Sequence, residues 1–149
     1  RHLFRMANEH RFFSPGTDRL IVEHCGWRIA PSICYDLRFP VWLRNRDDYD
    51  LTIFVANWPS KRQIAWSTLL RARAIENISY SCGVNVTGVD GAGVEYAGGS
   101  SIFDPVGEPI AEHFEDRVVA THTLSGAFLV ETRTNFPANL DNDKFSIEY

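Results

Sequence analysis

A nearly continuous apolar run of β-favouring residues, Leu-Thr-Ile-Phe-Val-Ala, occupies residues 51–56. Such a run is typical of a strand that is covered on both faces. Residues 60–79 follow with helical spacing, and Ser60 is a plausible N-cap because its hydroxyl oxygen can accept a backbone N–H. A central strand followed directly by a long helix, in a chain that also contains hairpins, predicts an α/β or α+β fold.

Shorter elements are expected on either side of this strand and helix. Turn-forming residues separate the apolar segments and mark their boundaries. The further strands expected are residues 20–23, 26–33, 81–87, the segment before a turn at 104–107, 109–112 and 118–123. The further helices expected are residues 40–46 and, capped by Ser125, residues 126–134, whereas residues 135–149 show no clear periodicity.

The composition restricts the partners and the compartment. The 149 residues are 44 % hydrophobic, which suffices for one core, and they carry a formal net charge of −4 with 15 basic residues in no long run. Nucleic acids and anionic membranes are therefore not expected as partners. No apolar run approaches the roughly 20 residues that span a bilayer. Three cysteines, an odd number, favour reduced thiols and a cytoplasmic protein.

Cys34 stands where the strand expected at 26–33 turns toward the helix expected at 40–46. At such a turn a thiol points outward, and nearby backbone N–H groups can lower its pKa and stabilise negative charge. A buried, inert cysteine is the common alternative. Asp36 and Arg38 follow closely and do not suit apolar burial. Cys34 is therefore a candidate nucleophile.

The segment around Cys34 resembles a family motif. Residues 33–40, Ile-Cys-Tyr-Asp-Leu-Arg-Phe-Pro, are similar to the nucleophile motif of the nitrilase superfamily, the carbon–nitrogen hydrolases, and most closely to its omega-amidase branch. Residues 71–77 and 98–107 resemble two further patterns of that family, and the resemblance extends over essentially the whole chain. Val41 is a departure, because relatives often have a glutamate there.

The resemblance implies the nitrilase-type α-β-β-α four-layer sandwich, subunits that form a homodimer or a higher homo-oligomer, and no cofactor or metal. It also implies a Glu–Lys–Cys triad. The family lysine ends a segment similar to residues 1–4, and the family glutamate lies further upstream, so the resemblance places both before residue 1. Residues 1–149 are thus expected to be the C-terminal part of a single hydrolase domain, inactive without the N-terminal segment that supplies the glutamate and lysine.

The same resemblance implies roles for three residues in hydrolysing a small carboxylic amide. Cys34 would attack the amide, form a thioester and release ammonia, while the backbone N–H of Tyr35 would bind the oxyanion. Glu9 matches the place of a second active-site glutamate that helps to position the substrate or the attacking water. A solvated surface carboxylate is the alternative for Glu9.

A loop is expected to border the substrate pocket. Asn57 and Trp58 follow the central strand, where α/β sheets commonly place ligand-binding groups, although Trp58 could instead fill the edge of the core. Arg38 could pair with a substrate carboxylate, but a structural pairing with Asp36 or Glu76 is the favoured interpretation.

Glu76 is expected on the buried stripe of the long helix, in line with Ala65, Leu69 and Ala72. An exposed ion pair with Arg73 would be the usual arrangement of two such residues. The family signature instead has this acid facing inward. Glu76 and Arg73 are therefore expected to orient groups behind the nucleophile, and Glu76 is not the first choice for the base.

Other functions remain as alternatives. The same fold could hydrolyse an N-carbamoyl amide or a nitrile, with the loop at Trp58 deciding by pocket shape. A non-catalytic binding or assembly protein is the alternative from another class. A papain-like Cys–His pair is disfavoured because none of the five histidines lies in a recognisable partner motif. A zinc site is disfavoured because Cys-x-x-Cys and His-x-x-x-His spacings are missing.

Overall fold

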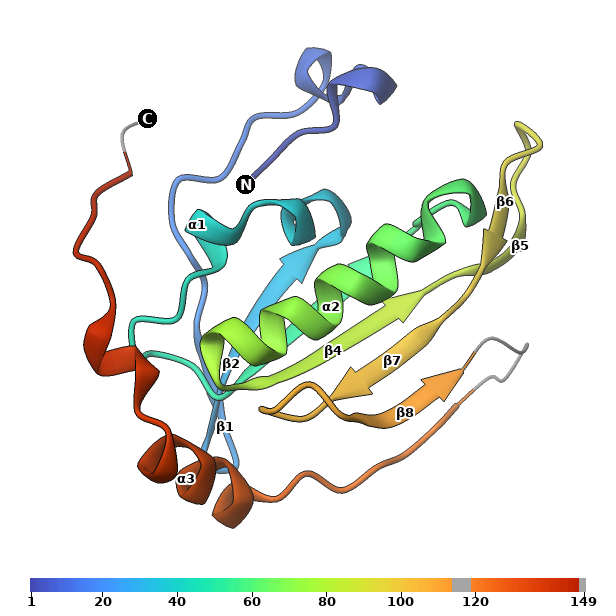
Figure 1. The fold of residues 1–149 in the computed structure, drawn as a ribbon. Helices are drawn as coiled ribbons and strands as arrows, with labels where there is room; N and C mark the ends of the chain where they lie inside the picture. Colours follow the sequence, from blue (N-terminus) through green and yellow to red (C-terminus); the bar gives the residue numbers. More distant parts are fainter. Residues whose placement is uncertain (114–118, 148–149) are drawn as a thin grey trace.

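Six strands form one mixed sheet in the computed structural model, which describes residues 1–113 and 119–147 (Figure 1). Their order is β1-β2-β3-β4-β7-β8, in which β2, β3 and β4 are parallel and the outer neighbours antiparallel. A separate ribbon consists of β5 and β6. The strands are β1 (Val22–His24), β2 (Trp27–Ile33), β3 (Leu51–Ala56), β4 (Tyr80–Asn85), β5 (Thr87–Val89), β6 (Glu95–Ala97), β7 (Ser100–Phe103) and β8 (Pro109–His113).

The helices connect and cover these strands. They are α1 (Pro40–Leu43), α2 (Gln63–Asn77) and α3 (Gly126–Asn135), with the 3-10 helices η1 (Arg5–Ala7), η2 (Glu9–Arg11), η3 (Cys34–Arg38), η4 (Ser60–Arg62) and η5 (Ala138–Asp141). Ser125 caps α3 as predicted, by accepting the backbone N–H of Phe128 at 3.1 Å. Ser60 does not cap α2, because it opens η4 and α2 begins only after Arg62. None of the helices described here is long and apolar enough to cross a membrane.

The α/β class predicted from the sequence is confirmed, and β3 has the bounds of the predicted central strand. Of the strand predicted at 118–123, residue 118 lies outside the described residues. The rest of that prediction is wrong, since residues 119–123 form no strand. They run instead outside the sheet toward α3 (Figure 1), because the chain must pass from β8 at one edge to α3 near the opposite edge.

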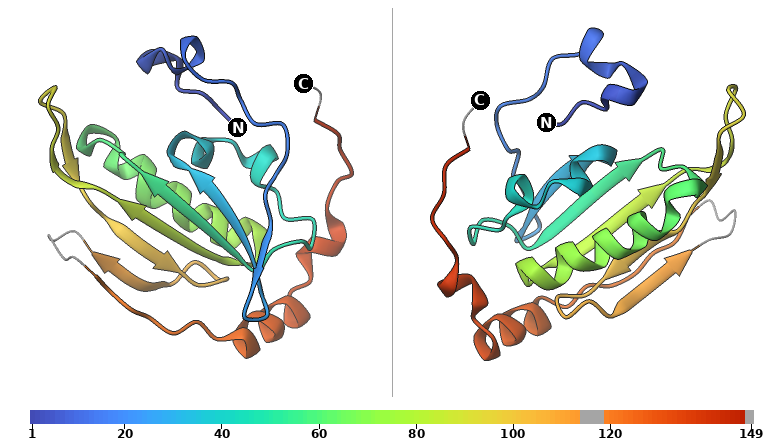
Figure 2. Two further views of the ribbon diagram at one scale, coloured as in Figure 1. Left: turned by 180° about the vertical axis from the view of Figure 1, so that it is seen from behind. Right: turned by 45° about the horizontal axis from the view of Figure 1, so that its top comes forward.

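One face of the sheet packs against α2. Phe54 of β3 and Phe103 of β7 are fully buried in a cluster with Trp66 and Leu70 of α2. Figures 1 and 2 show α2 lying along this face, with its axis nearly aligned with β4 and its chain running in the opposite direction. The main core of the described chain is therefore the layer between α2 and the sheet.

The buried side of α2 is shifted by one residue from the predicted side. Its buried residues are Trp66, Leu70, Arg73, Ala74 and Asn77. The residues predicted to be buried, which are only half-buried, are Ala65, Leu69, Ala72 and Glu76. A Cβ at Gly83 of β4 would lie 2.6 Å from Trp66 Cζ2 and still closer to Leu70 Cδ1. The missing side chain at Gly83 thus gives the two large side chains of α2 their space against the sheet.

The other face of the sheet is covered only in part by the described residues. α3 covers the end near β1, where Leu129 is buried in a small apolar cluster. At the carboxyl end, Ile33, Val55 and Val84 are neighbours on β2, β3 and β4 and are 68 %, 52 % and 50 % exposed. The prediction that residues 51–56 are covered on both faces is therefore wrong for this end of β3 within the described chain.

A carboxylate at the start of β3 joins α3 to the sheet. Asp50 accepts hydrogen bonds from Arg28 Nη2 and from Arg133 Nη1, both at 2.8 Å. Arg133 also donates to the backbone carbonyls of Tyr49 and Ile78. Burial opposes ionisation of Asp50, but the hydrogen bonds from the two arginines outweigh it and lower the pKa of Asp50 from 3.8 to about 2.

Asp50→Asn should lower the free energy of unfolding at pH 7 by about 1.5–3 kcal/mol, because Arg28 and Arg133 lose a charged acceptor. Since folding lowers the pKa of Asp50, its contribution is fully present above about pH 4 and is lost as the pH falls toward 2. Denaturant unfolding should show the gap between wild type and variant closing in this window. The control is Asp47→Asn, because Asp47 is exposed and 3.8 Å from Arg28. Equal effects of both substitutions would contradict this account.

Gly83→Ala should destabilise the fold by about 1–3 kcal/mol, because the added methyl group would have to displace Trp66 and Leu70. Gly91→Ala is the matched control, since a Cβ there would meet nothing within 4 Å. Its effect should stay within about 0.5 kcal/mol. Thermal unfolding measures both, and a loss at Gly83 no larger than at Gly91 would show that α2 does not depend on this close approach.

Candidate active site

Cys34 lies at the carboxyl end of β2, directly after Ile33, where η3 begins. Its φ of +39° is in the left-handed region, which residues other than glycine rarely adopt. Figure 1 shows that β2 and β4 point toward the end of the molecule where α2 begins and where η1 and η2 lie. The strand-to-helix turn predicted at Cys34 is confirmed, with η3 between β2 and α1.

The Cys34 thiol is half-buried against the main core. Burial raises its pKa, and the charges of Glu9 and Asp36 add to this, whereas a hydrogen bond from the Asn57 backbone and the charge of Arg62 oppose it. A backbone group does lower the thiol pKa as predicted, but burial outweighs it, so the pKa of Cys34 is raised overall. A base must take the proton before this sulfur can attack.

Asp36 connects the chain at residues 1–2 to the turn that holds Cys34. Its Oδ1 accepts the backbone N–H of His2 and lies beside His2 Nδ1, both at 2.9 Å, and its Oδ2 accepts the N–H of Ile33 at 3.2 Å. The His2 ring stacks on Phe39, with 3.6 Å between ring centroids. One buried carboxylate thus fixes the residue before Cys34 and the segment that passes beside it.

Glu9 reaches the same region from η2. Its Oε2 accepts the backbone N–H of Phe4 at 2.6 Å, and the Phe4 ring packs on Tyr35 with 5.0 Å between centroids. Glu9 is half-buried, so it is not the fully solvated carboxylate of the alternative interpretation. The structure brings Glu9, Tyr35 and Cys34 together, whereas the catalytic roles of Glu9 and of the Tyr35 N–H stay predictions.

Arg73 supports the turn from the side of α2. Its Nε and Nη2 donate to the carbonyl of Leu37 at 3.2 and 2.8 Å, and its Nη1 pairs with Glu76 Oε1 at 2.7 Å. Arg73 is 3 % exposed, so this is not an exposed helix pair. Glu76 therefore acts on the Cys34 turn through Arg73, an arrangement that suits an orienting residue, and its part in catalysis stays a prediction.

The loop after β3 is held by Asn85, the last residue of β4. Asn85 accepts the backbone N–H of Trp58 at 2.7 Å and donates to its carbonyl at 3.0 Å. Trp58 is 2 % exposed and belongs to the core cluster, so it fills the core edge. Asn57 is exposed, and its backbone N–H reaches the thiol of Cys34. Of this loop, Asn57 faces the site, and its predicted contact with substrate stays a prediction.

Arg38 packs on Trp58, with its Cζ 4.8 Å from the ring centroid. The two carboxylates that it was expected to brace have other partners, since Asp36 contacts His2 and Glu76 contacts Arg73. In the described part of the chain Arg38 forms no ion pair with either. That pairing is replaced by a cation–π contact, and a role of Arg38 in binding substrate stays a prediction.

Two residues near Cys34 were not singled out from the sequence. The charge of Arg62 acts on the thiol. Tyr96 donates to Asp90 at 2.8 Å, which raises the pKa of Tyr96, and the charge of Cys34 adds to that shift. Arg62 lies on η4 and Tyr96 lies on β6. No apolar periodicity in the sequence predicts where these two segments run. By contrast, the polar ends of neighbouring parallel strands are a signal that could have identified Asn85.

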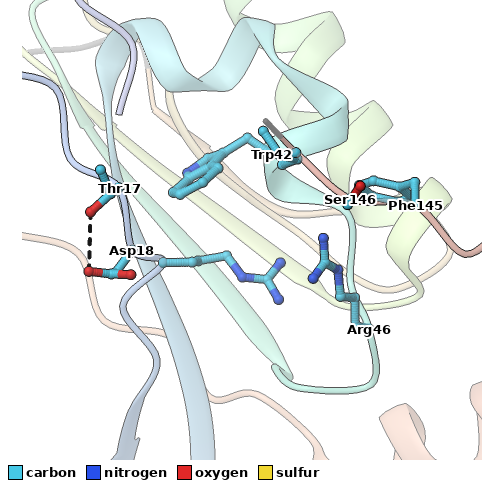
Figure 3. Close-up of a pocket in the computed structure, with 8 residues that line it drawn as sticks. Thr17, Asp18, Trp42, Arg46, Phe145 and Ser146 are labelled. Atoms are coloured by element: carbon cyan, nitrogen blue, oxygen red, sulfur yellow. Dashed lines mark hydrogen bonds between the residues drawn. The ribbon is translucent and has the colours of Figure 1, made fainter. Parts of the chain in front are cut away.

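Two surface cavities of the described chain lie away from this site. The larger has a volume of about 340 Å³ and is bordered by Trp42, Arg46 and Phe145, as Figure 3 shows, and Arg46 lies over the Phe145 ring. The smaller, of about 150 Å³, lies beside His2. Cys34 lines neither of them. Within residues 1–113 and 119–147, no group of three or more His, Cys, Asp or Glu side chains is placed to hold a metal ion.

Comparison with known proteins shows which family this sequence is similar to. The family model for carbon–nitrogen hydrolases matches residues 1–133. The omega-amidase YafV of Escherichia coli K12 is 53 % identical over 150 residues, which cover 99 % of this chain and 58 % of that protein. The 2-oxoglutaramate amidase of Bacillus subtilis is 34 % identical over 138 residues, which cover 91 % of this chain and 53 % of that protein.

A solved structure has the same arrangement of strands and helices. XC1258 from Xanthomonas campestris, a CN-hydrolase superfamily protein with an arsenic adduct in its active site, matches with a TM-score of 0.96 and 53 % identity. The match covers 99 % of this chain and 59 % of that one, so the chain spans less than two thirds of the length of these relatives. The site around Cys34, the family match and this likeness together show that the chain belongs to the carbon–nitrogen hydrolase family.

Proposed function

We propose that the full-length protein hydrolyses a small carboxylic amide, as an omega-amidase does, with Cys34 as its nucleophile. The observation that supports this most strongly is the position of Cys34. It stands in a left-handed turn at the carboxyl end of a parallel strand, with Glu9 on one side and the Arg73–Glu76 pair behind the turn. Relatives that are named omega-amidase and 2-oxoglutaramate amidase supply the substrate class.

The reaction would proceed through a thioester. The Cys34 sulfur adds to the amide carbon while its proton passes to a base, and the Tyr35 N–H stabilises the oxyanion. The C–N bond then breaks, and the nitrogen takes up a proton and leaves as ammonia. Water, positioned with the help of Glu9, cleaves the thioester to a carboxylic acid and restores the thiol. No cofactor takes part in these steps.

The base and a further oxyanion donor would come from a glutamate and a lysine outside residues 1–149, in a segment preceding residue 1. Two observations support this proposal. Burial raises the pKa of Cys34, so the thiol needs a base, and the chain spans 58 % of the Escherichia coli relative. Residues 1–149, as the C-terminal part of a hydrolase domain, would then be inactive alone.

We propose further that the full-length protein folds as the four-layer sandwich. It would assemble as a homodimer or a higher homo-oligomer in the cytoplasm. The exposed row of Ile33, Val55 and Val84 is an apolar surface on which a second sheet could pack. The free thiols of Cys25, Cys34 and Cys82 suit a reducing compartment.

Ammonia release by the full-length protein should be faster with 2-oxoglutaramate than with an N-carbamoyl amino acid or a nitrile, and Cys34→Ser should abolish it because the thiol is the nucleophile. The control is Cys82→Ser, on β4, which should retain turnover. Faster hydrolysis of the N-carbamoyl compound or the nitrile would show that this compound, and not a small carboxylic amide, represents the substrate class. Turnover of none of the three would favour the non-catalytic binding protein.

Iodoacetamide, an amide that alkylates thiols, should modify Cys34 of the full-length protein before Cys25 or Cys82, because the site binds amides and its base deprotonates the thiol. Peptide mass spectrometry over time measures the three rates. Exposed Cys25 serves as the internal control for unassisted reaction. Labelling of Cys25 ahead of Cys34 would argue against an activated nucleophile.

Glu76→Gln should lower kcat by about tenfold and the free energy of unfolding by about 1.5–3 kcal/mol, because the buried Arg73 guanidinium loses its charged partner and holds the Leu37 carbonyl less firmly. Steady-state kinetics and denaturant unfolding measure the two effects. Glu131→Gln, an exposed change on α3, is the control. If kcat is unchanged in Glu76→Gln, the Arg73–Glu76 pair contributes to stability alone.

A further inference from the structure

Tyr96 is half-buried although most of the ribbon that carries it is exposed. In β5 and β6, Thr87 is the other half-buried residue, and the remaining residues are exposed. Figures 1 and 2 show the ribbon projecting beyond the start of α2, at the end of the molecule where β2 and β4 end. Strand β6 also contacts η4. The face of the ribbon that carries Tyr96 is therefore turned toward the end of the sheet where Cys34 lies.

The Tyr96 ring is held in one orientation on this ribbon. Gly88 is its partner in the β5–β6 ladder and has no side chain, so the ring has room across the neighbouring strand. The Tyr96 hydroxyl donates to Asp90 Oδ2 at 2.8 Å. The other oxygen of Asp90 accepts the backbone N–H groups of Ala92 and Val94, each at 2.9 Å. One carboxylate thus fixes both the turn of the ribbon and the far end of the ring.

The ribbon is anchored to elements that border the Cys34 turn. The Gly98 carbonyl accepts Asn85 Nδ2 at 2.7 Å, and the Gly99 carbonyl accepts Trp66 Nε1 at 2.8 Å. Both glycines have a left-handed φ, of +68° and +74°, so the chain bends where the ribbon leaves β7. Asn85 also holds the loop after β3. The ribbon therefore has a fixed position relative to the site, as a residue that selects substrates requires.

An acyl group on the Cys34 sulfur extends away from the core and toward the ribbon. The buried core cluster packs against Cys34 from behind and leaves no room on that side. Asp90 has the largest effect on the pKa of Tyr96, but the charge of Cys34 also raises it and the charge of Arg62 lowers it. The ring is therefore within electrostatic reach of the thiol, on the outward side of the site.

We infer that the Tyr96 ring sets the maximum length of the acyl group that the site beside Cys34 accepts. This inference rests on the proposed amidase function and adds to it a residue that selects substrates by size. The ring cannot turn aside without losing its hydrogen bond to Asp90, so it acts as a steric limit. A short acyl group fits between the ring and the sulfur, whereas a longer one collides with the ring.

The test compares two monoamides with the same end groups in the full-length protein. Adipamate is longer than succinamate by two methylene groups. Tyr96→Ala should raise the ratio of kcat/KM for adipamate to that for succinamate on the order of tenfold, because it removes the steric limit. Tyr96→Phe should raise this ratio less, since it keeps the ring and loses only the bond to Asp90.

Two further variants make the comparison specific. Glu95→Ala changes the exposed neighbour of Tyr96, whose side chain points to the opposite face of the ribbon, and should leave the ratio unchanged. Tyr96→Trp enlarges the ring and should lower the ratio. An unchanged ratio in both Tyr96→Ala and Tyr96→Trp would overturn the inference. An equal rise in Glu95→Ala and Tyr96→Ala would also overturn it, because the ribbon as a whole, and not the ring, would then set the limit.

Alkylation of Cys34 separates this inference from the proposed reaction, because it needs no turnover. N-hexylmaleimide should react with Cys34 more slowly than N-ethylmaleimide, and Tyr96→Ala should raise the ratio of the two rates on the order of tenfold. Peptide mass spectrometry measures both rates, with exposed Cys25 as the internal reference. If Tyr96→Ala raises this ratio but no amide is hydrolysed, the size limit stands and the proposed function fails. If amides are hydrolysed and neither ratio responds to Tyr96, the inference fails alone.

Discussion

Two buried charges of opposite sign hold the turn on which the site depends. Asp36 binds the backbone of Ile33 and His2 on one side, and Arg73 binds the carbonyl of Leu37 on the other. A left-handed φ at a non-glycine residue costs energy, on the order of 1–3 kcal/mol, and persists only where its surroundings enforce it. The polar contacts of Asp36 and Arg73 provide that enforcement, so the half-buried position of the thiol is a property of the fold.

The same turn explains why the Cys34 thiol does not ionise easily by itself. Packing on the core gives the Cys34 turn its rigidity, and this burial raises the pKa of the thiol. Rigid placement and easy ionisation therefore oppose each other here. A cysteine in such a turn needs a base to take its proton before the sulfur can attack.

The sequence predicted the parts of the fold that depend on local pattern. The apolar run of β3 and the Ser125 cap of α3 have direct local signals, and both were found. The buried side of α2 lies one residue away from the predicted side. It is set by the close approach of α2 to Gly83, a contact between distant segments of the chain. Arg62 was missed for a similar reason, since its place beside Cys34 results from the path of a loop. Motif resemblance predicted Cys34 as the nucleophile, and only the folded chain showed what surrounds it.

The central claim is that Cys34 forms a thioester with the substrate. The most direct measurement is acid quenching of the full-length protein during turnover of 2-oxoglutaramate, followed by mass spectrometry of the peptide that contains Cys34. The account predicts an acyl adduct on Cys34 that disappears on treatment with hydroxylamine and is missing in Cys34→Ala. An adduct on another residue, or continued turnover by Cys34→Ala, would contradict it.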